Sequence, residues 1–180
     1  MAMESGINES FRKLRLGTIK ALTEEQEEYR CYLRDVFFLH KTWCLVVGGT
    51  KGNGKSYMAE VTIATYNCDG FADAYYVTQP LLEAELRMDG AKAFLKYARC
   101  AALIIDELSD RSSDWTEYIK TQIESILIER HGQNLATAII GNVSLKRMGD
   151  MFDVRVKDRF REGITFSMTG PSLRRNYEQQ

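Results

Sequence analysis

The strongest chemical signal in the sequence is a glycine-rich segment that matches the pattern GxxxxGK[ST] at every position. Its residues are Gly49, Thr50, Lys51, Gly52, Asn53, Gly54, Lys55 and Ser56. Glycines let the backbone curl so that its N–H groups point at phosphate oxygens, and a helix start adds a favourable dipole. Lys55 would neutralise the β- and γ-phosphates, and the Ser56 hydroxyl would reach Mg²⁺. The segment predicts a site for ATP or ADP with Mg²⁺, the alternative being a glycine-rich turn without a ligand.

Two adjacent acids follow the apolar run 101–105, namely Asp106 and Glu107. Acids at the end of a buried strand are costly unless a cation or a hydrogen-bond donor meets them. Asp106 is placed to hold Mg²⁺ through water, and Glu107 is placed to polarise an attacking water as a general base. The pair therefore favours hydrolysis over binding alone. The alternative is that both acids simply end the strand in solvent.

Two further polar positions extend this group of residues. Asn142 follows the apolar run 135–140, where its amide could lie near the γ-phosphate and orient the water. The alternative for Asn142 is a turn residue. The charged segment 154–161 carries arginines that could reach a nucleotide held by a neighbouring subunit and stabilise transition-state charge. The alternative for that segment is a solvated basic helix face.

Apolar runs alternate with amphipathic stretches along the chain, which is typical of an α/β protein built from βα units. We expect strands at 43–47, 74–78, 101–105, 135–140 and 164–168. We expect helices at 23–39, 54–67, 80–99 with a break at 89–90, 115–129 and 145–160. Wholly apolar strands imply a parallel sheet covered on both faces, whose ligands bind beyond the carboxyl ends of the strands. The chemical motifs all follow such strand ends.

Composition sets the broad class of the protein. The 180 residues suit one domain, and 44% hydrophobic with 27% charged residues is ordinary for a globular chain. A net charge of −1 excludes a uniformly basic nucleic-acid coat but allows a local basic patch. Widely spaced cysteines argue for reduced thiols in a cytoplasmic protein rather than a zinc site or disulfides. No apolar run approaches the roughly 18 residues that cross a membrane.

The order of these motifs resembles that of the AAA+ ATPases, and more narrowly the DnaC-type replicative helicase loaders and the related IstB transposition ATPases. The resemblance runs from about residue 9 to residue 175. The acidic pair with Leu108 is close to the family's DELG or DEIG. The segment 158–160 (DRF) is similar to the family's D-R-L/M, and 170–174 (GPSLR) is similar to its closing G-x-S-Y-R.

The resemblance implies a P-loop NTPase of AAA+ type, with a five-stranded parallel sheet between helices. From the sequence itself we expect no C-terminal helical lid domain after the fifth strand. The resemblance divides the chain into a lead-in at 1–22, an ATPase domain at 23–170 and a polar tail at 171–180. It makes Arg159 the finger that acts across a nucleotide-bridged interface between subunits. It also adds Tyr57 and Arg174 to the nucleotide contacts.

The implied activity is ATP hydrolysis, weak in the monomer, in a cytoplasmic protein of a bacterium or of its phage or prophage. The implied partners are a replicative helicase hexamer and single-stranded DNA, without a membrane. Alternatives are an IstB-like helper, which shares every motif, and a P-loop kinase, which would need an acceptor pocket and an arginine-bearing lid. A scaffold without turnover fits less well, because a pure binder needs no base such as Glu107.

The sequence departs from the resembling family at a few places. Asn53 stands where the family usually has Thr, and Leu173 replaces Tyr. The stretch 79–99, where the family carries a DNA-contacting helical insert, is short. Charge and stacking for DNA could still come from a few side chains in this stretch. They are Arg87, Lys92, Phe94 and Lys96.

Overall fold

The computed structural model of the protein describes residues 14–37, 43–47, 52–68, 73–108 and 116–168. In these ranges one sheet contains β1 (Trp43–Val47), β2 (Ala74–Thr78), β3 (Ala102–Leu108), β4 (Ala136–Gly141) and β5 (Ile164–Ser167). The strand order is β2-β3-β4-β1-β5, and every neighbouring pair is parallel. The predicted α/β class with a parallel sheet is confirmed.

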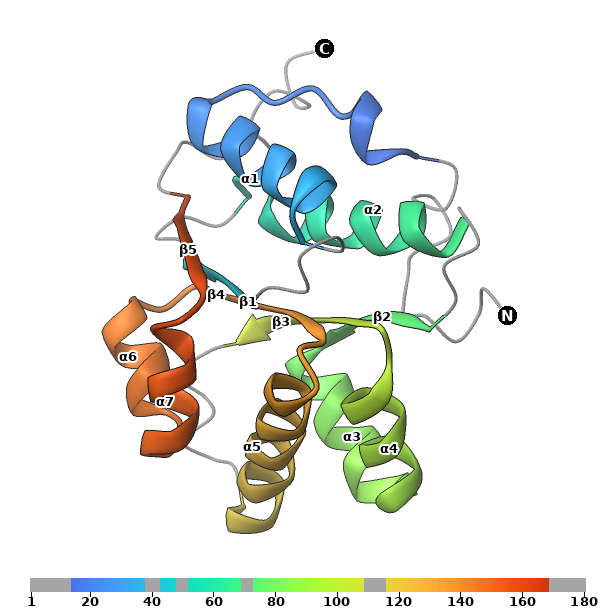
Figure 1. The fold of residues 1–180 in the computed structure, drawn as a ribbon, viewed down its shortest axis with the longest axis vertical. Helices are drawn as coiled ribbons and strands as arrows, with labels where there is room; N and C mark the ends of the chain where they lie inside the picture. Colours follow the sequence, from blue (N-terminus) through green and yellow to red (C-terminus); the bar gives the residue numbers. More distant parts are fainter. Residues whose placement is uncertain (1–13, 38–42, 48–51, 69–72, 109–115, 169–180) are drawn as a thin grey trace.

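Helices cover both faces of the sheet (Figure 1). One face carries the short 3-10 helix η3 (Leu16–Thr18), α1 (Glu24–Asp35) and α2 (Lys55–Cys68). The other face carries α3 (Gln79–Asp89), α4 (Ala91–Arg99), α5 (Glu117–Gly132), α6 (Leu145–Asp150) and α7 (Val154–Phe160). Among the described helices, none has the length and apolar character that a bilayer crossing would need.

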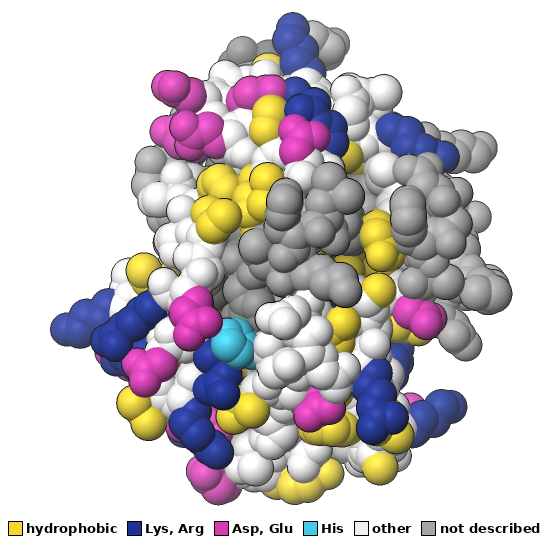
Figure 2. Space-filling view, in the orientation of Figure 1, with side chains coloured by type: hydrophobic (Ala, Val, Ile, Leu, Met, Phe, Trp, Pro, Cys, Tyr) yellow, Lys and Arg dark blue, Asp and Glu magenta, His cyan; other side chains and the backbone are white. Residues whose placement is uncertain are grey.

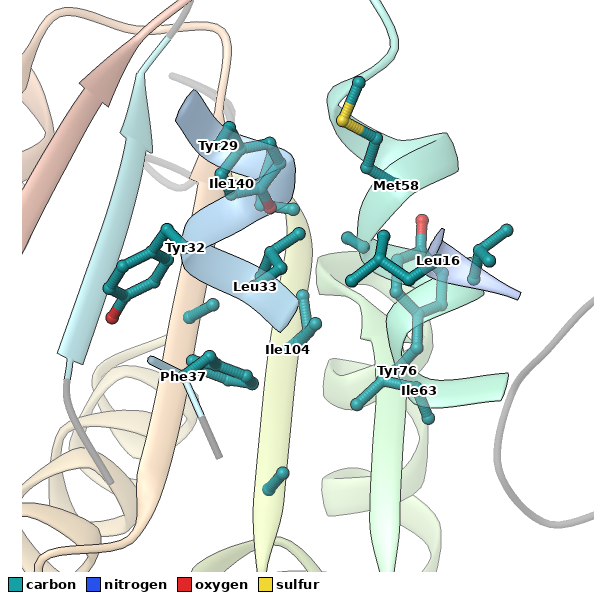
Figure 3. Close-up of a cluster of buried hydrophobic side chains, with 14 of the residues drawn as sticks. Leu16, Tyr29, Tyr32, Leu33, Phe37, Met58, Ile63, Tyr76, Ile104 and Ile140 are labelled. Atoms are coloured by element: carbon teal, nitrogen blue, oxygen red, sulfur yellow. The ribbon is translucent and has the colours of Figure 1, made fainter. Parts of the chain in front are cut away.

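The two layers of helices explain why the strands are apolar without interruption. Side chains of a strand alternate between the faces, so Ile104 of β3 joins the cluster under α1 and α2. Leu103 and Ile105 join the cluster under α3, α4 and α5. Figure 3 shows the first cluster, in which side chains of α1 and α2 lie over Tyr76, Ile104 and Ile140 of three neighbouring strands. Both clusters fix the strands whose ends carry the polar motifs.

Helix boundaries follow local capping residues. The predicted helix at 115–129 begins at Glu117, because the Thr116 side chain accepts a hydrogen bond from the Ile119 amide at 3.4 Å.

The predicted helical stretch 145–160 is two helices rather than one. Ser144 caps α6 by accepting from the Arg147 amide at 3.2 Å. Asp153 caps α7 by accepting from the Val156 amide at 3.0 Å. A second cap inside the stretch starts a second helix, so the chain turns between α6 and α7. This turn decides where the arginines of α7 lie.

Candidate functional site

The carboxyl edge of the sheet brings the polar motifs together. β4 lies between β3 and β1, and its last residue, Gly141, pairs with Val47 of β1 and Leu108 of β3. Asn142 comes directly after β4, so it lies between the end of the acidic strand and the strand that leads into the glycine-rich segment. A Cβ on Gly141 would meet the Leu108 carbonyl oxygen at 2.9 Å, so this close approach needs a glycine.

The described part of the glycine-rich segment has the backbone of a tight loop. Gly52 and Gly54 have φ of 87° and 92°, a conformation that side-chain-bearing residues rarely adopt. α2 begins directly after them at Lys55, so the first N–H groups of the helix are available to an anion at this end. Ser56 and Tyr57 are exposed. The other predicted contacts, Gly49, Thr50 and Lys51, lie outside the described residues.

Lys55 is buried although it carries a charge. Only 5% of the residue is exposed, and its Nζ donates to Oδ1 of Asn53 at 2.8 Å. Burial lowers the pKa of Lys55, and the nearby carboxylate of Asp106 acts in the opposite direction. The negative charge of Asp106 at the end of β3 therefore acts on the ammonium group of Lys55.

Asn53 is a site residue whose contacts the sequence did not reveal. It is 2% exposed, and its Nδ2 donates to the carbonyl oxygen of Met168, just after β5. Its own carbonyl oxygen accepts from Nε2 of Gln26 in α1 at 2.9 Å. The oxygen of that glutamine side chain accepts from the Leu22 amide at 2.8 Å. Gln26 is also new to the site, since no pattern in the sequence indicates that this side chain reaches the glycine-rich segment.

Asp106 is held by two donors at the end of β3. It is 2% exposed, its Oδ2 accepts from the Tyr76 hydroxyl at 2.7 Å, and its Oδ1 accepts from the Glu107 amide at 2.6 Å. Burial, with the charge of Asp106, raises the pKa of Tyr76, so this hydroxyl stays a donor. Nothing in the sequence alone indicates that a β2 side chain reaches the acid on β3.

Glu107 occupies an irregular point of the sheet. Its φ is 62°, in the left-handed region, and the pairing of β3 with β4 shifts register between Ile105 and Leu108. A bulge of this kind re-aims the side chain at its centre. Asp106 is therefore buried while Glu107 is exposed. Backbone strain of this type concentrates at functional sites.

The predicted arginines are placed differently. Arg159 lies on α7, where its Nη1 donates to the Arg155 carbonyl oxygen at 2.7 Å. Its Nε is buried and finds no hydrogen-bond partner among the described residues. The structure thus keeps this guanidinium against its own helix instead of bringing it to the acidic pair. Arg174 lies outside the described residues.

The residues predicted to meet DNA fall into two groups. Arg87 on α3 and Lys92 on α4 are exposed. Phe94 packs against the cluster under α3 to α5. Lys96 forms an ion pair with Glu85 at 2.9 Å and lies over two tyrosine rings. Of these four residues, only Arg87 and Lys92 have exposed side chains that could contact the phosphate backbone of DNA.

Basic side chains also gather over α6 and α7, at the lower left of Figure 2. Its arginines are partly neutralised by neighbouring acids. Arg155 pairs with Asp153 at 2.9 Å, and Arg161 pairs with Asp158 at 3.0 Å. Exposed pairs of this kind contribute little to stability and leave a mixed, solvated face.

The oxygen ligands at the site suit a magnesium ion. Mg²⁺ prefers hard oxygen ligands and typically binds one or two carboxylates together with substrate phosphates and water. The carboxylate of Asp106 and the exposed hydroxyl of Ser56 supply donors of this type. The same edge carries the helix start and the lysine that suit the phosphates.

Comparison with known proteins gives matches in structure alone. No protein-family model matches the sequence, and a search of curated proteins gave no match. The crystal structure of DnaI is 16% identical, with a TM-score of 0.70 over 92% of this chain and 93% of that one. The crystal structure of the DnaC helicase loader is 17% identical, with a TM-score of 0.67 over 90% of this chain and all of that one.

DnaA is similar in the same way over part of its length. AMPPCP-bound DnaA from Aquifex aeolicus is 14% identical, with a TM-score of 0.74 over 90% of this chain and 51% of that one. The chain therefore spans about half of that DnaA structure and nearly all of the DnaI and DnaC structures. The fold described above is thus the one that the DnaI, DnaC and DnaA structures share with this chain.

Proposed function

We propose that the protein binds and hydrolyses ATP and acts as a DnaC-like loader of the replicative helicase onto single-stranded DNA. One observation carries the enzymatic part: the strand ends bearing Asp106, Glu107 and Asn142 share the sheet edge with Lys55, whose pKa responds to Asp106. The replication role is supported by the fold, which is shared with structures titled DnaI, DnaC helicase loader and DnaA.

In the proposed reaction, Lys55 and the N–H groups at the start of α2 bind the β- and γ-phosphates. Ser56 and Asp106 would hold Mg²⁺, which supplies neutralisation of phosphate charge. Asn142 orients a water, and Glu107 accepts its proton as the water oxygen bonds to the γ-phosphorus and the bond to the β-phosphate oxygen breaks. The exposed position of Glu107 at the bulge suits contact with that water.

Arg159 is proposed to act on the nucleotide of a neighbouring subunit. Its buried Nε without a partner among the described residues supports a guanidinium that is completed elsewhere. Such a finger is worth about 10³-fold or more in turnover. The Arg159→Ala variant should therefore bind ATP normally and fail to gain activity as protein concentration rises. A variant that still gains activity on concentration would remove the finger assignment.

The experiment for the whole proposal is ATP turnover by the purified chain, at rising protein concentration and with single-stranded DNA or a replicative helicase hexamer. Turnover that rises with concentration and responds to DNA or helicase supports an assembling loader. Arg87 and Lys92 supply the first substitutions to test for DNA contact, because both are exposed. Turnover that does not change with single-stranded DNA or helicase, together with phosphorylation of a small acceptor molecule, would instead indicate a kinase.

A further inference from the structure

The side-chain amide of Asn53 connects two parts of the chain that are far apart in the sequence. Its Oδ1 accepts from the Lys55 ammonium at 2.8 Å, and its Nδ2 donates to the carbonyl oxygen of Met168, 115 residues away. The two ends of the amide differ in chemistry, since the oxygen only accepts and the nitrogen only donates. A flipped amide would lose both bonds, so its orientation is fixed by its two partners.

Both anchors of this bridge are buried. Met168 is 1% exposed and belongs to the core cluster under α1 and α2, directly after β5. The Asn53 backbone is held separately, because its carbonyl oxygen accepts from Gln26 of α1 at 2.9 Å. α1 and the end of β5 thus fix Asn53 through different atoms. Asn53 in turn fixes the ammonium at the start of α2.

This arrangement bears on phosphate binding. A lysine has a long side chain that loses much rotational freedom when an anion captures it. An ammonium has three N–H donors, so a bond to Asn53 is compatible with further bonds to phosphate oxygens. Ordering the side chain before the anion arrives removes part of the entropy loss from the binding step.

We propose that Asn53 is a positioning residue that holds the Lys55 ammonium ready for the nucleotide phosphates by tying it to the carbonyl of Met168. The inference rests on the proposed function, since it assumes that Lys55 meets phosphate. Asn53 is also the position where the sequence departs from the Thr usual in the resembling family.

The test compares two polar-to-apolar substitutions of nearly unchanged side-chain size, one just before α2 and one in the middle of α2, each of which removes buried hydrogen bonds. Asn53→Leu removes both bonds of the bridge. Thr62→Val is the matched control, since the Thr62 hydroxyl donates to the Met58 carbonyl oxygen at 2.7 Å within α2 and is buried. Calorimetric titration with ADP and ATP gives affinity, and chemical denaturation without nucleotide gives stability.

We expect both variants to lose stability, whereas only Asn53→Leu binds ADP and ATP more weakly, by about tenfold, the size of effect expected when the entropy cost of ordering a lysine side chain moves into the binding step. A merely structural Asn53 would behave like Thr62 and leave affinity unchanged. If Asn53→Leu does not fold, Asn53→Ala provides the same comparison with less apolar bulk, and wild-type affinity in that folded variant overturns the inference.

The outcomes separate this inference from the proposed function. A wild-type chain that binds neither nucleotide overturns the proposed function, and the phosphate role of Asn53 with it. A wild-type chain that binds both nucleotides, with an Asn53→Leu variant that binds them equally well, overturns only the inference about Asn53.

Discussion

Two buried cations lie at opposite ends of the strands, and their surroundings differ. Arg130 at the end of α5 is fully buried near the start of β3 and β4, whereas Lys55 lies at the carboxyl edge. Arg130 donates to the carbonyl oxygens of Tyr97, Cys100 and Ala136 at 2.6 to 2.8 Å. These acceptors belong to the backbone of the fold itself.

Lys55 instead donates to a side-chain amide, beside two glycines with positive φ and the start of a helix. Burial lowers the pKa of both cations. The comparison teaches that burial and a displaced pKa do not by themselves indicate a functional site. The nature of the acceptors does: fixed backbone oxygens around Arg130 close a core, whereas the helix start and nearby carboxylate around Lys55 suit an anion with its metal.

The largest expected effect is the loss of nucleotide binding in Lys55→Ala. This variant removes the charge that meets the phosphates, so binding of ATP should fall below detection in a calorimetric titration. Stability should stay within about 1 kcal/mol of wild type, because the substitution also removes the cost of burying a charge. Measurable ATP binding at wild-type strength would contradict the difference drawn between the two cations.

Arg130→Met should destabilise the protein by about 3–5 kcal/mol, because it leaves several buried carbonyl oxygens without a donor. Chemical denaturation measures this loss. The folded fraction should bind ADP with wild-type affinity, since Arg130 contacts none of the residues at the carboxyl edge in its described hydrogen bonds. Arg130→Lys is the control, as it keeps the charge without the planar fork. A weakened ADP affinity in folded Arg130→Met would contradict the assignment of Arg130 to the core alone.

Glu107→Gln should keep ATP binding and lower turnover by about 10²-fold or more, which corresponds to roughly 3 kcal/mol in the barrier. The amide fills the same space but cannot accept the proton of the attacking water. Steady-state turnover at saturating ATP, next to a binding titration, separates the two quantities. Equal turnover in the variant and the wild type would remove Glu107 from the mechanism.

Tyr76→Phe should have the smallest effect. The free energy of unfolding should fall by about 1 kcal/mol, because the variant removes one hydroxyl that donates to Asp106 at 2.7 Å. A less well held carboxylate should raise the Mg²⁺ concentration needed for half-maximal turnover several-fold. Tyr97→Phe is the matched control, since the Tyr97 hydroxyl donates to Glu85 at 2.8 Å. Tyr97 belongs to the core cluster on the opposite face of the sheet from Tyr76. Equal Mg²⁺ dependence in both variants would show that Tyr76 only packs.

The sequence predicted the elements of the fold well where burial is periodic. β3 was expected from its continuous apolar run, and its two covered faces explain that run. The break between α6 and α7 was missed, because Asp153 acts as a second cap inside an otherwise helical pattern.

The candidate site was predictable in its strand ends but not in its cross-chain contacts. The motifs around Lys55, Asp106 and Asn142 follow strands, and parallel strands bring such ends to one edge. The hydroxyl of Tyr76 reaches Asp106 only because β2 pairs with β3 in one particular register. The bond from Asn53 to Met168 likewise depends on where β5 ends. Pairing partners of this kind leave no local pattern in the chain.

Because Glu107 has a left-handed backbone conformation, the residue type that is best for stability at this position differs from the one proposed to be best for turnover. A non-glycine residue in this region costs about 1–2 kcal/mol, a cost that glycine largely avoids. A library screened only for thermal resistance should therefore enrich glycine at this position and yield sturdy, inactive chains. A library screened for both properties should retain the glutamate and gather its stabilising changes elsewhere.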